Sequence, residues 1–302
     1  MILYETINLL SNCYEGRFDR IFLQKVVFGL HITAVELSDG LTGFASTVPP
    51  SDNDVHCRKD KRYFGPFSPL QFIGQSVEDL LALSDDKNLI VSLKTAVINA
   101  LSSPFLGERN ETLIAGADPV DLIHPGWLSG KKVSLVGAFH SYIEKFVARG
   151  CQLKVLELNE DALQGDEKQY FAPAQAYPDL LPHSDLVVIT GLTLVNQTFA
   201  NLAAALSSYS LNIVTGPTSS FLPDALFARN IHLIGGTRLT RPELLFQLAA
   251  EGGAGYHLFR YCAEKISLIK DPSDPRLQLS STAVICNPKT TFCRKILSNL
   301  PS

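Results

Sequence analysis

No two cysteines in the chain have the C-x-x-C spacing, and this absence argues against a zinc-finger motif, which depends on it. In an intracellular chain of this size, reduced thiols used for packing are the default. Cys57 differs from the others because His56 precedes it in a polar loop. The six cysteines are spread over the whole length, at Cys13, Cys57, Cys151, Cys262, Cys286 and Cys293.

Long apolar runs and a basic charge are also missing. The longest apolar run, residues 89–101, is interrupted by Lys94 and Asn99, so we expect no membrane span. The first fifteen residues contain Glu5 and no basic segment, which favours an amphipathic helix over a secretion signal and predicts a cytoplasmic protein. A net charge of −4 and a pI near 6.0 argue against nucleic acid as a partner.

The chain lacks the short motifs that identify common active sites. It contains no H-x-x-x-H or H-E-x-x-H, and therefore no sign of a preformed metal cage. It contains no G-x-S-x-G, so Ser219 is not the nucleophile of a hydrolase elbow. Whether the protein is an enzyme stays open.

The length of the chain, 302 residues, and its hydrophobic content of 46% predict two domains. Residues 1–117 predict a small α+β unit: a helix over 2–15, apolar strand-like runs over 21–37 and 41–48, and helices over 77–83 and 89–101. Ser38-Asp39-Gly40 predicts a hairpin turn, and Ser76 and Asn88 are the expected helix N-caps. The polar segment 49–75 is too irregular for a helix or strand and is a candidate lid. Residues 271–302 show no periodicity and are expected to be a tail or decoration.

Residues 118–270 alternate strand-like and helix-like segments. Strand-like runs occupy 132–138, 153–159, 185–191, 212–216 and 232–236, with helical patterns at 140–150, 195–206 and 242–253. Such alternation predicts an α/β fold with a Rossmann-like, doubly wound parallel sheet.

Three of these strands are expected to end at glycine, where small hydroxyl residues begin. Because the carboxyl ends of parallel strands face the ligand crevice, these ends predict one wall of a binding site. The first end, which includes the Thr198 hydroxyl, can hold an anion at a helix start, although capping the helix is the more typical single role for Asn196 there. The candidate ligand-binding residues are Thr190, Gly191, Thr193 and Asn196, then Gly216, Pro217, Thr218 and Ser219, then Gly235 and Gly236.

The first strand of the second block lacks a dinucleotide fingerprint. Gly137 is followed by Ala138, Phe139 and His140 rather than by the further glycines of G-x-G-x-x-G, so conventional NAD binding is disfavoured. Glu157 nevertheless lies 20 residues beyond Gly137, the spacing of the acid that holds a ribose. A solvated strand-end carboxylate is the alternative reading. We add Gly137, Phe139, His140 and Glu157 to the candidate ligand-binding residues.

The chain resembles a family of domains of unknown function named for heavy-metal chelation. The resemblance rests on VVFGLHITAVELSDGLTGFAST, VSLVGAF, TGLTLVNQTF, VTGPTSSFLPDALF and IHLIGGTRLTRPE, and it covers roughly residues 20 to 265. It implies an amino-terminal domain shaped like that of enolase, a Rossmann-like carboxy-terminal domain, a site at their junction and, more weakly, chelation. It implies no enolase chemistry, because the catalytic barrel of that superfamily is absent.

Two functions remain. The first is binding or chelation of a transition metal or metal complex in an interdomain cleft, with His56 and Cys57 as candidate metal ligands that need partners such as His140 or Glu157. The alternative is an enzyme acting on a nucleotide-like or phosphorylated small molecule in the same cleft. In both cases the partner is a small molecule or metal complex, and the amino-terminal domain is expected to form the facing wall. A homo-oligomer is compatible with either.

Overall fold

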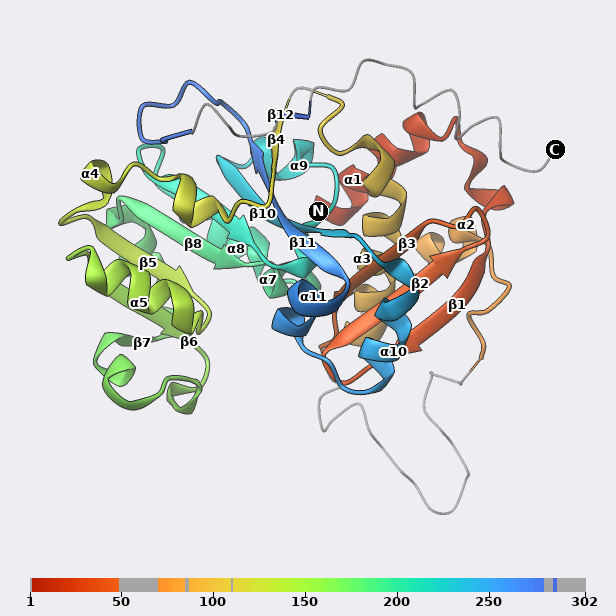
Figure 1. Ribbon diagram of the computed structural model, residues 1–302, viewed down its shortest axis with the longest axis horizontal. Helices are drawn as coiled ribbons and strands as arrows, with labels where there is room; N and C mark the ends of the chain where they lie inside the picture. Colours follow the sequence, from red (N-terminus) through yellow and green to blue (C-terminus); the bar gives the residue numbers. More distant parts are fainter. Residues whose placement is uncertain (1, 49–69, 85–86, 110, 280–284, 287–302) are drawn as a thin grey trace.

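The computed structural model describes residues 2–48, 70–84, 87–109, 111–279 and 285–286, and Figure 1 shows their arrangement. Within these ranges the strands form a three-stranded and a nine-stranded sheet. The helices are α1 (Ile2–Cys13), α2 (Val77–Ala82), α3 (Asn88–Ser102), α4 (Pro125–Leu128), α5 (His140–Ala148), α6 (Tyr177–Leu180), α7 (Leu192–Val195), α8 (Phe199–Ala204), α9 (Asp224–Phe227), α10 (Leu245–Ala250) and α11 (Gly255–Tyr261). The strands are β1 (Leu23–Phe28), β2 (Ile32–Leu37), β3 (Thr42–Ser46), β4 (Thr112–Ala115), β5 (Lys132–Val136), β6 (Gln152–Glu157), β7 (Phe171–Pro173), β8 (Leu186–Thr190), β9 (Leu211–Thr215), β10 (Leu233–Leu239), β11 (Ala263–Ile269) and β12 (Ile285–Cys286).

The small sheet is an antiparallel meander of β1, β2 and β3, as the amino-terminal pattern predicts. The expected hairpin turn is confirmed, with Gly40 at φ 84° and the Asp39 carboxylate accepting the Leu41 N–H at 3.1 Å. Ser76 caps α2 by accepting the Asp79 N–H at 3.0 Å. The cap expected at Asn88 is wrong: α3 already includes Asn88, and the capping position falls on Lys87, whose side chain makes no capping bond.

The large sheet has the strand order β12-β4-β11-β10-β9-β8-β5-β6-β7. Strands β5 to β10 are mutually parallel. Numbered 1 to 6 along the chain, they lie side by side in the order 3-2-1-4-5-6, which is the strand order of a Rossmann fold. This confirms the predicted Rossmann-like sheet. Strands β11, β4 and β12 extend it in antiparallel fashion. The sheet therefore also includes residues from before position 118 and after position 270.

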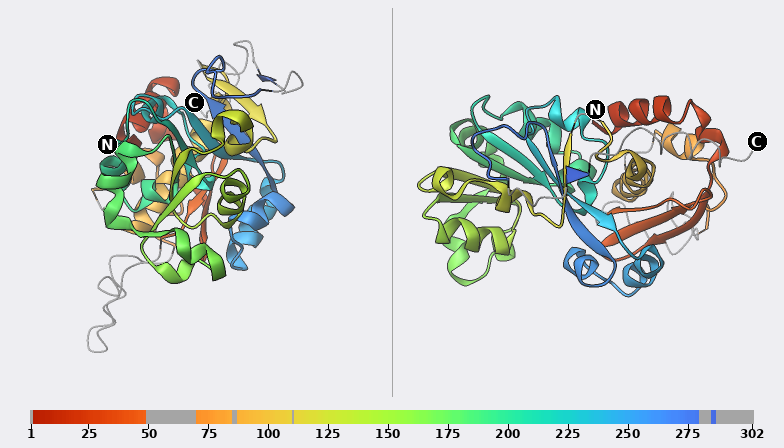
Figure 2. Two further views of the ribbon diagram at one scale, coloured as in Figure 1. Left: turned by 90° about the vertical axis from the view of Figure 1, so that its left-hand side faces the viewer. Right: turned by 45° about the horizontal axis from the view of Figure 1, so that its top comes forward.

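Helices cover both faces of the parallel strands, which is the doubly wound arrangement. Leu186 and Val188 of β8 pack into the cluster that contains Phe146 of α5. Val187 and Ile189 of the same strand pack into the cluster on the opposite face. That second cluster also contains residues of α1, α3, α7 and α8, so the amino-terminal unit and the sheet share one core. Figure 2 shows the three-stranded sheet at the end of the molecule remote from β6 and β7.

Two elements differ from the sequence pattern. The helix expected over 195–206 begins only at Phe199, as α8, because Gln197 has a left-handed φ of 63° and separates it from α7, which ends at Val195. The strand expected to end at Gly236 continues to Leu239, and Gly235 and Gly236 pair with β11 inside it. A Cβ on Gly235 would overlap the Thr215 hydroxyl, so this glycine allows close packing within the sheet rather than a turn.

The two sheets are joined by a buried set of hydrogen bonds. The Asn99 side-chain amide of α3 donates to the Phe44 carbonyl at 2.7 Å and to the Thr218 carbonyl at 3.3 Å. The Thr218 hydroxyl accepts the Ser46 N–H at 3.0 Å and donates to the Ser46 hydroxyl at 2.9 Å. Since Thr218 and Asn99 are almost completely buried, these bonds fix the turn after β9 against β3 and α3.

Among the described helices, none has the combined length and apolar composition that spanning a bilayer requires.

Helix α3 crosses β3 at Gly43, where a Cβ would overlap the carbonyl oxygen of Ala96. We therefore expect Gly43→Ala to lower the free energy of unfolding by about 3 kcal/mol, since the clash is with backbone that cannot rotate away. Gly40→Ala is the control, because open space surrounds the added Cβ. Only the positive φ is unfavourable for alanine there, and it should lower the free energy of unfolding by about 1 kcal/mol. Urea denaturation measures both, and equal losses would contradict the crossing as described.

His232, just before β10, provides a pH test of the carboxy-terminal half. Its Nδ1 accepts the Asn212 N–H at 3.2 Å, and burial, reinforced by the charge of Arg276, lowers the pKa of His232 to about 4 from 6.5. The unfolded chain therefore takes up the proton first as the pH falls, so stability from the neutral ring is complete above pH 6.5 and is lost as the pH falls from 6.5 to about 4.

We expect His232→Asn, which keeps an acceptor for Asn212, to lose stability less steeply than the wild type across that range. The difference in slope should stay below about 1.4 kcal/mol per pH unit, because the ring is partly exposed and its charge is screened. Urea midpoints at several pH values measure it. Parallel slopes for the two proteins would show that His232 is protonated equally in the folded and unfolded states.

Candidate functional site

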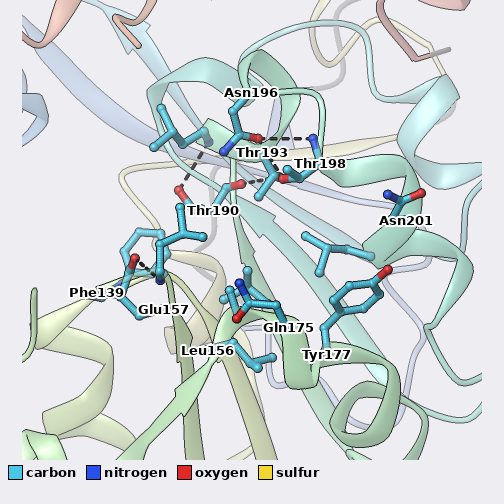
Figure 3. Close-up of a pocket in the computed structure, with 17 residues that line it drawn as sticks. Phe139, Leu156, Glu157, Gln175, Tyr177, Thr190, Thr193, Asn196, Thr198 and Asn201 are labelled. Atoms are coloured by element: carbon cyan, nitrogen blue, oxygen red, sulfur yellow. Dashed lines mark hydrogen bonds between the residues drawn. The ribbon is translucent and has the colours of Figure 1, made fainter. Parts of the chain in front are cut away.

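A cavity of about 450 Å³ lies at the carboxyl ends of β5, β6 and β8 (Figure 3). The strand order reverses between β5 and β8, so this is the topological switch point at which open α/β sheets bind ligands. We call it the switch-point cavity. It brings together seven of the residues that the sequence singles out: Gly137, Phe139, Glu157, Thr190, Thr193, Asn196 and Thr198.

Glu157 is the one charged side chain among the described residues that line the switch-point cavity. Its Oε2 accepts the Ala138 N–H at 3.0 Å, and its Oε1 accepts the Leu158 N–H at 2.7 Å. These two bonds fix the carboxylate across the ends of β5 and β6. Each carboxylate oxygen retains a second acceptor position, so Glu157 can still bind a hydroxyl, an N–H or a cation.

The turn after β5 has its amide groups engaged within the protein. Gly137 N–H donates to the Leu156 carbonyl, Ala138 N–H to Glu157, and Phe139 N–H to the Gly137 carbonyl, each at 3.0 Å. In a dinucleotide site such amides point at the pyrophosphate instead. The described lining also contains no Lys or Arg. Both features oppose the binding of a phosphate beside the negative charge of Glu157.

Hydroxyl and amide groups form the opposite wall. Figure 3 shows Thr190, Thr193, Asn196 and Thr198 gathered on one side of the cavity. The Thr193 hydroxyl donates to the Thr190 carbonyl at 2.7 Å, and Asn196 Oδ1 accepts both the N–H and the hydroxyl of Thr198, at 3.2 and 2.7 Å. Asn196 thus holds the turn between α7 and α8, but the N-cap role suggested for it is wrong, because the capping position of α8 falls on Thr198 and Asn196 ends α7.

The sequence reading missed three polar residues of the lining, Gln175, Tyr177 and Asn201. Gln175 and Tyr177 follow β7, a strand of three residues that is too short to show a periodic pattern. Asn201 lies on α8 three residues after Thr198, so helical spacing from Thr198 could have indicated it.

The other predicted ligand residues lie outside this lining. His140 opens α5 and contacts the Glu167 carboxylate at 2.8 Å. Gly191 donates its N–H to the Thr215 carbonyl, and the Ser219 hydroxyl donates to the Gly216 and Gly235 carbonyls. The turn from Gly216 to Ser219 packs against the amino-terminal unit, and Gly235 and Gly236 lie within β10.

The amino-terminal unit contributes no described residue to the switch-point cavity, so the expected facing wall is not found there. A separate, largely apolar cavity of about 480 Å³ does lie between α1 and the α7–α8 segment. Thr193 lines both cavities, and the α7–α8 segment separates them.

His56 and Cys57, the candidate metal ligands, lie outside the described residues. Across the described ranges, no group of three or more His, Cys, Asp or Glu side chains could hold a metal ion. Among the described residues that line the switch-point cavity, only Glu157 is a strong metal ligand, whereas a transition metal takes four or more ligands. The described donor set therefore does not fit a metal held by the protein alone.

The strand order and the switch-point cavity define a Rossmann-like α/β protein with a smaller antiparallel unit at its amino terminus. Two family models match the chain, at residues 118–268 and 12–102, and each carries the description "Putative heavy-metal chelation". The first match alone spans half of the chain. The protein belongs to this family.

Solved structures of family members share the fold. A protein of unknown function from Pyrococcus horikoshii is 20% identical, with a TM-score of 0.65 over 86% of this chain and 98% of its own. A second, from Desulfitobacterium hafniense DCB-2, is 17% identical, with a TM-score of 0.60 over the same shares. No curated protein matches the chain. The comparisons thus establish the family and the fold.

The turn at Asn196 can be tested separately from any ligand. We expect Asn196→Ala to lower the free energy of unfolding by about 1 kcal/mol, because Thr198 loses the acceptor for its N–H at the start of α8. Asn196→Asp keeps that acceptor and should remain close to the wild type. Urea denaturation compares the two variants, and a loss of similar size in both would mean that the Oδ1 bonds do not hold the turn.

Proposed function

We propose that the protein binds a metal complex, a metal ion already held by an organic chelator, in the switch-point cavity. The observation that carries this proposal is the position of Glu157: a single carboxylate, fixed by two backbone N–H groups, in a cavity otherwise lined by hydroxyls, amides and apolar groups. The family description supports metal as the cargo.

A complex suits the cavity better than a bare ion. Glu157 offers one or two oxygen ligands, so most of the coordination positions of a transition metal would have to be filled by something else. An organic chelator fills them and presents N–H, O–H and apolar groups. The amides and hydroxyls of Gln175, Tyr177, Thr190 and Asn201 can hydrogen-bond such groups, and Glu157 favours a complex of net positive charge.

A nucleoside-like ligand is the second candidate. Glu157 ends β6, the strand whose terminal acid holds the ribose hydroxyls in Rossmann folds, and its remaining acceptor positions suit a diol. The phosphate part is disfavoured, because the Ala138 N–H is used by Glu157 and the described lining holds no cation. If the protein is an enzyme, its substrate therefore carries no phosphate at the turn after β5.

Thermal unfolding with matched probes tests the metal-complex proposal. Nickel bound to ethylenediamine carries net positive charge, whereas nickel bound to EDTA carries net negative charge. We expect the cationic complex to raise the melting temperature and the anionic complex to leave it unchanged. At a hundredfold excess over Kd, binding adds up to about 2.7 kcal/mol to the free energy of unfolding. Glu157→Gln should lose the shift, because it removes the charge while keeping the shape.

The control is Glu160→Gln, which removes an exposed carboxylate three residues away and outside the lining. It should keep the full shift. A bare-nickel arm, with and without His56→Ala and Cys57→Ser together, tests those two residues as metal ligands. The proposal is wrong if Glu157→Gln responds to the cationic complex like the wild type, or if adenosine raises the melting temperature while no nickel complex does.

A further inference from the structure

The switch-point cavity differs in chemistry between its two sides. Glu157 supplies the one charged group of the described lining, and Figure 3 shows the Tyr177 ring and the Asn201 amide on the side away from it. Gln175 lies between Glu157 and Tyr177 in the same view. Gln175 and Tyr177 follow β7, whereas Asn201 belongs to α8. We call Gln175, Tyr177 and Asn201 the amide wall.

The hydrogen-bonding groups of the amide wall are open to a ligand. Gln175 and Asn201 are exposed, Tyr177 is half-buried, and all three line the cavity. Within the described part of the chain, none of the three side chains makes a hydrogen bond. The hydroxyls of Thr193 and Thr198, in contrast, already donate within the protein. The amide wall is therefore the part of the lining that can read the organic portion of a ligand.

The groups of the amide wall favour a neutral partner that both donates and accepts. A carboxamide places N–H donors beside a carbonyl acceptor, so it pairs with another carboxamide in both directions at once. A ligand carboxylate is disfavoured on this side, because the described lining contains no Lys or Arg and the anion would lose water without meeting a cation. Two carboxamides and a phenol hydroxyl thus match an amide group of the ligand.

We propose that the chelator held in the switch-point cavity is an amino-acid amide, whose carboxamide is bound by the amide wall. The inference rests on the proposed binding of a metal complex and specifies its organic part. The cationic metal end lies toward Glu157, and the carboxamide bonds to Asn201 and Tyr177. A cavity of about 450 Å³ is within the range of roughly 300–1,000 Å³ that small-molecule sites occupy.

Nickel complexes of histidinamide and histamine form the critical pair of probes. Both chelators bind nickel through an imidazole and an amine nitrogen, and both complexes are cations, but only histidinamide carries a carboxamide. We expect the histidinamide complex to bind about tenfold more tightly, because its carboxamide gains partners in the amide wall. Isothermal titration calorimetry with the preformed complexes gives the two affinities. Equal affinities would overturn the inference.

Asn201→Leu locates the interaction. It replaces the amide with an apolar side chain of similar size at an exposed position of α8, where leucine favours the helix. The tenfold preference for histidinamide should disappear. Gln152→Leu is the matched control, because it makes the same kind of replacement at an exposed position at the start of β6, outside the lining, and it should keep the preference. An unchanged preference in Asn201→Leu would contradict the inference.

Two further variants separate the two sides of the cavity. Tyr177→Phe removes only the hydroxyl, and it should reduce the preference for histidinamide about threefold. Glu157→Gln should weaken both complexes and keep their ratio, because both meet the same charge. If Glu157→Gln abolishes the preference while Tyr177→Phe and Asn201→Leu keep it, the carboxamide lies at Glu157 and the inference is wrong.

The outcomes distinguish this inference from the proposed function. If the two complexes bind equally and Glu157→Gln weakens both, the cavity takes a metal complex but does not recognise the carboxamide. If metal-free histidinamide binds as tightly as its nickel complex, the carboxamide is recognised but metal is not the cargo. If neither complex binds, both are wrong.

Discussion

The contact between Asn99, Ser46 and Thr218 is the constraint on which the arrangement of the molecule depends. One amide and one hydroxyl join β3, α3 and the turn after β9, and each is buried and hydrogen-bonded. Removing one member would leave several buried polar groups without partners, which is why such a set is costly to break. With the turn after β9 held against the amino-terminal unit, the ends of β5, β6 and β8 remain as the open edge of the sheet. The switch-point cavity lies at these ends, where the strand order reverses between β5 and β8.

Glu157 gives this cavity an electrostatic character unlike that of a dinucleotide site. In a Rossmann fold the amides after the first strand form a positive end that receives phosphate. Here the Ala138 N–H receives the carboxylate of the protein itself, while Gly137 and Phe139 donate to main-chain carbonyls. The negative charge is thus built into the protein, and it favours a neutral or positive ligand over an anionic one, as the proposed metal complex requires.

Sequence pattern predicted the parallel strands, the hairpin at Asp39-Gly40 and the strand-end part of the lining of the switch-point cavity, because hydrophobic alternation and strand-end positions depend on nearby residues. It could not assign the hydroxyls of the turn from Gly216 to Ser219. A threonine at a strand end looks the same whether it binds a ligand or another segment, and the partner of Thr218 lies 172 residues away at Ser46. Gly235 and Gly236 were ambiguous in a similar way, since glycine serves both turns and close packing.

The turn from Gly216 to Ser220 lies between the switch-point cavity and the amino-terminal unit, and its bonding indicates a single fixed arrangement. On one side Gly216 lies beside Gly191, which leads into α7 and the switch-point cavity. On the other side the Ser220 hydroxyl accepts the Thr237 N–H of β10 at 2.9 Å. A segment relays the effect of a ligand only if it has two arrangements. The hydroxyls of Thr218, Ser219 and Ser220 are all hydrogen-bonded within the protein, so the turn has one well-satisfied arrangement, and a ligand in the switch-point cavity gains nothing by changing it.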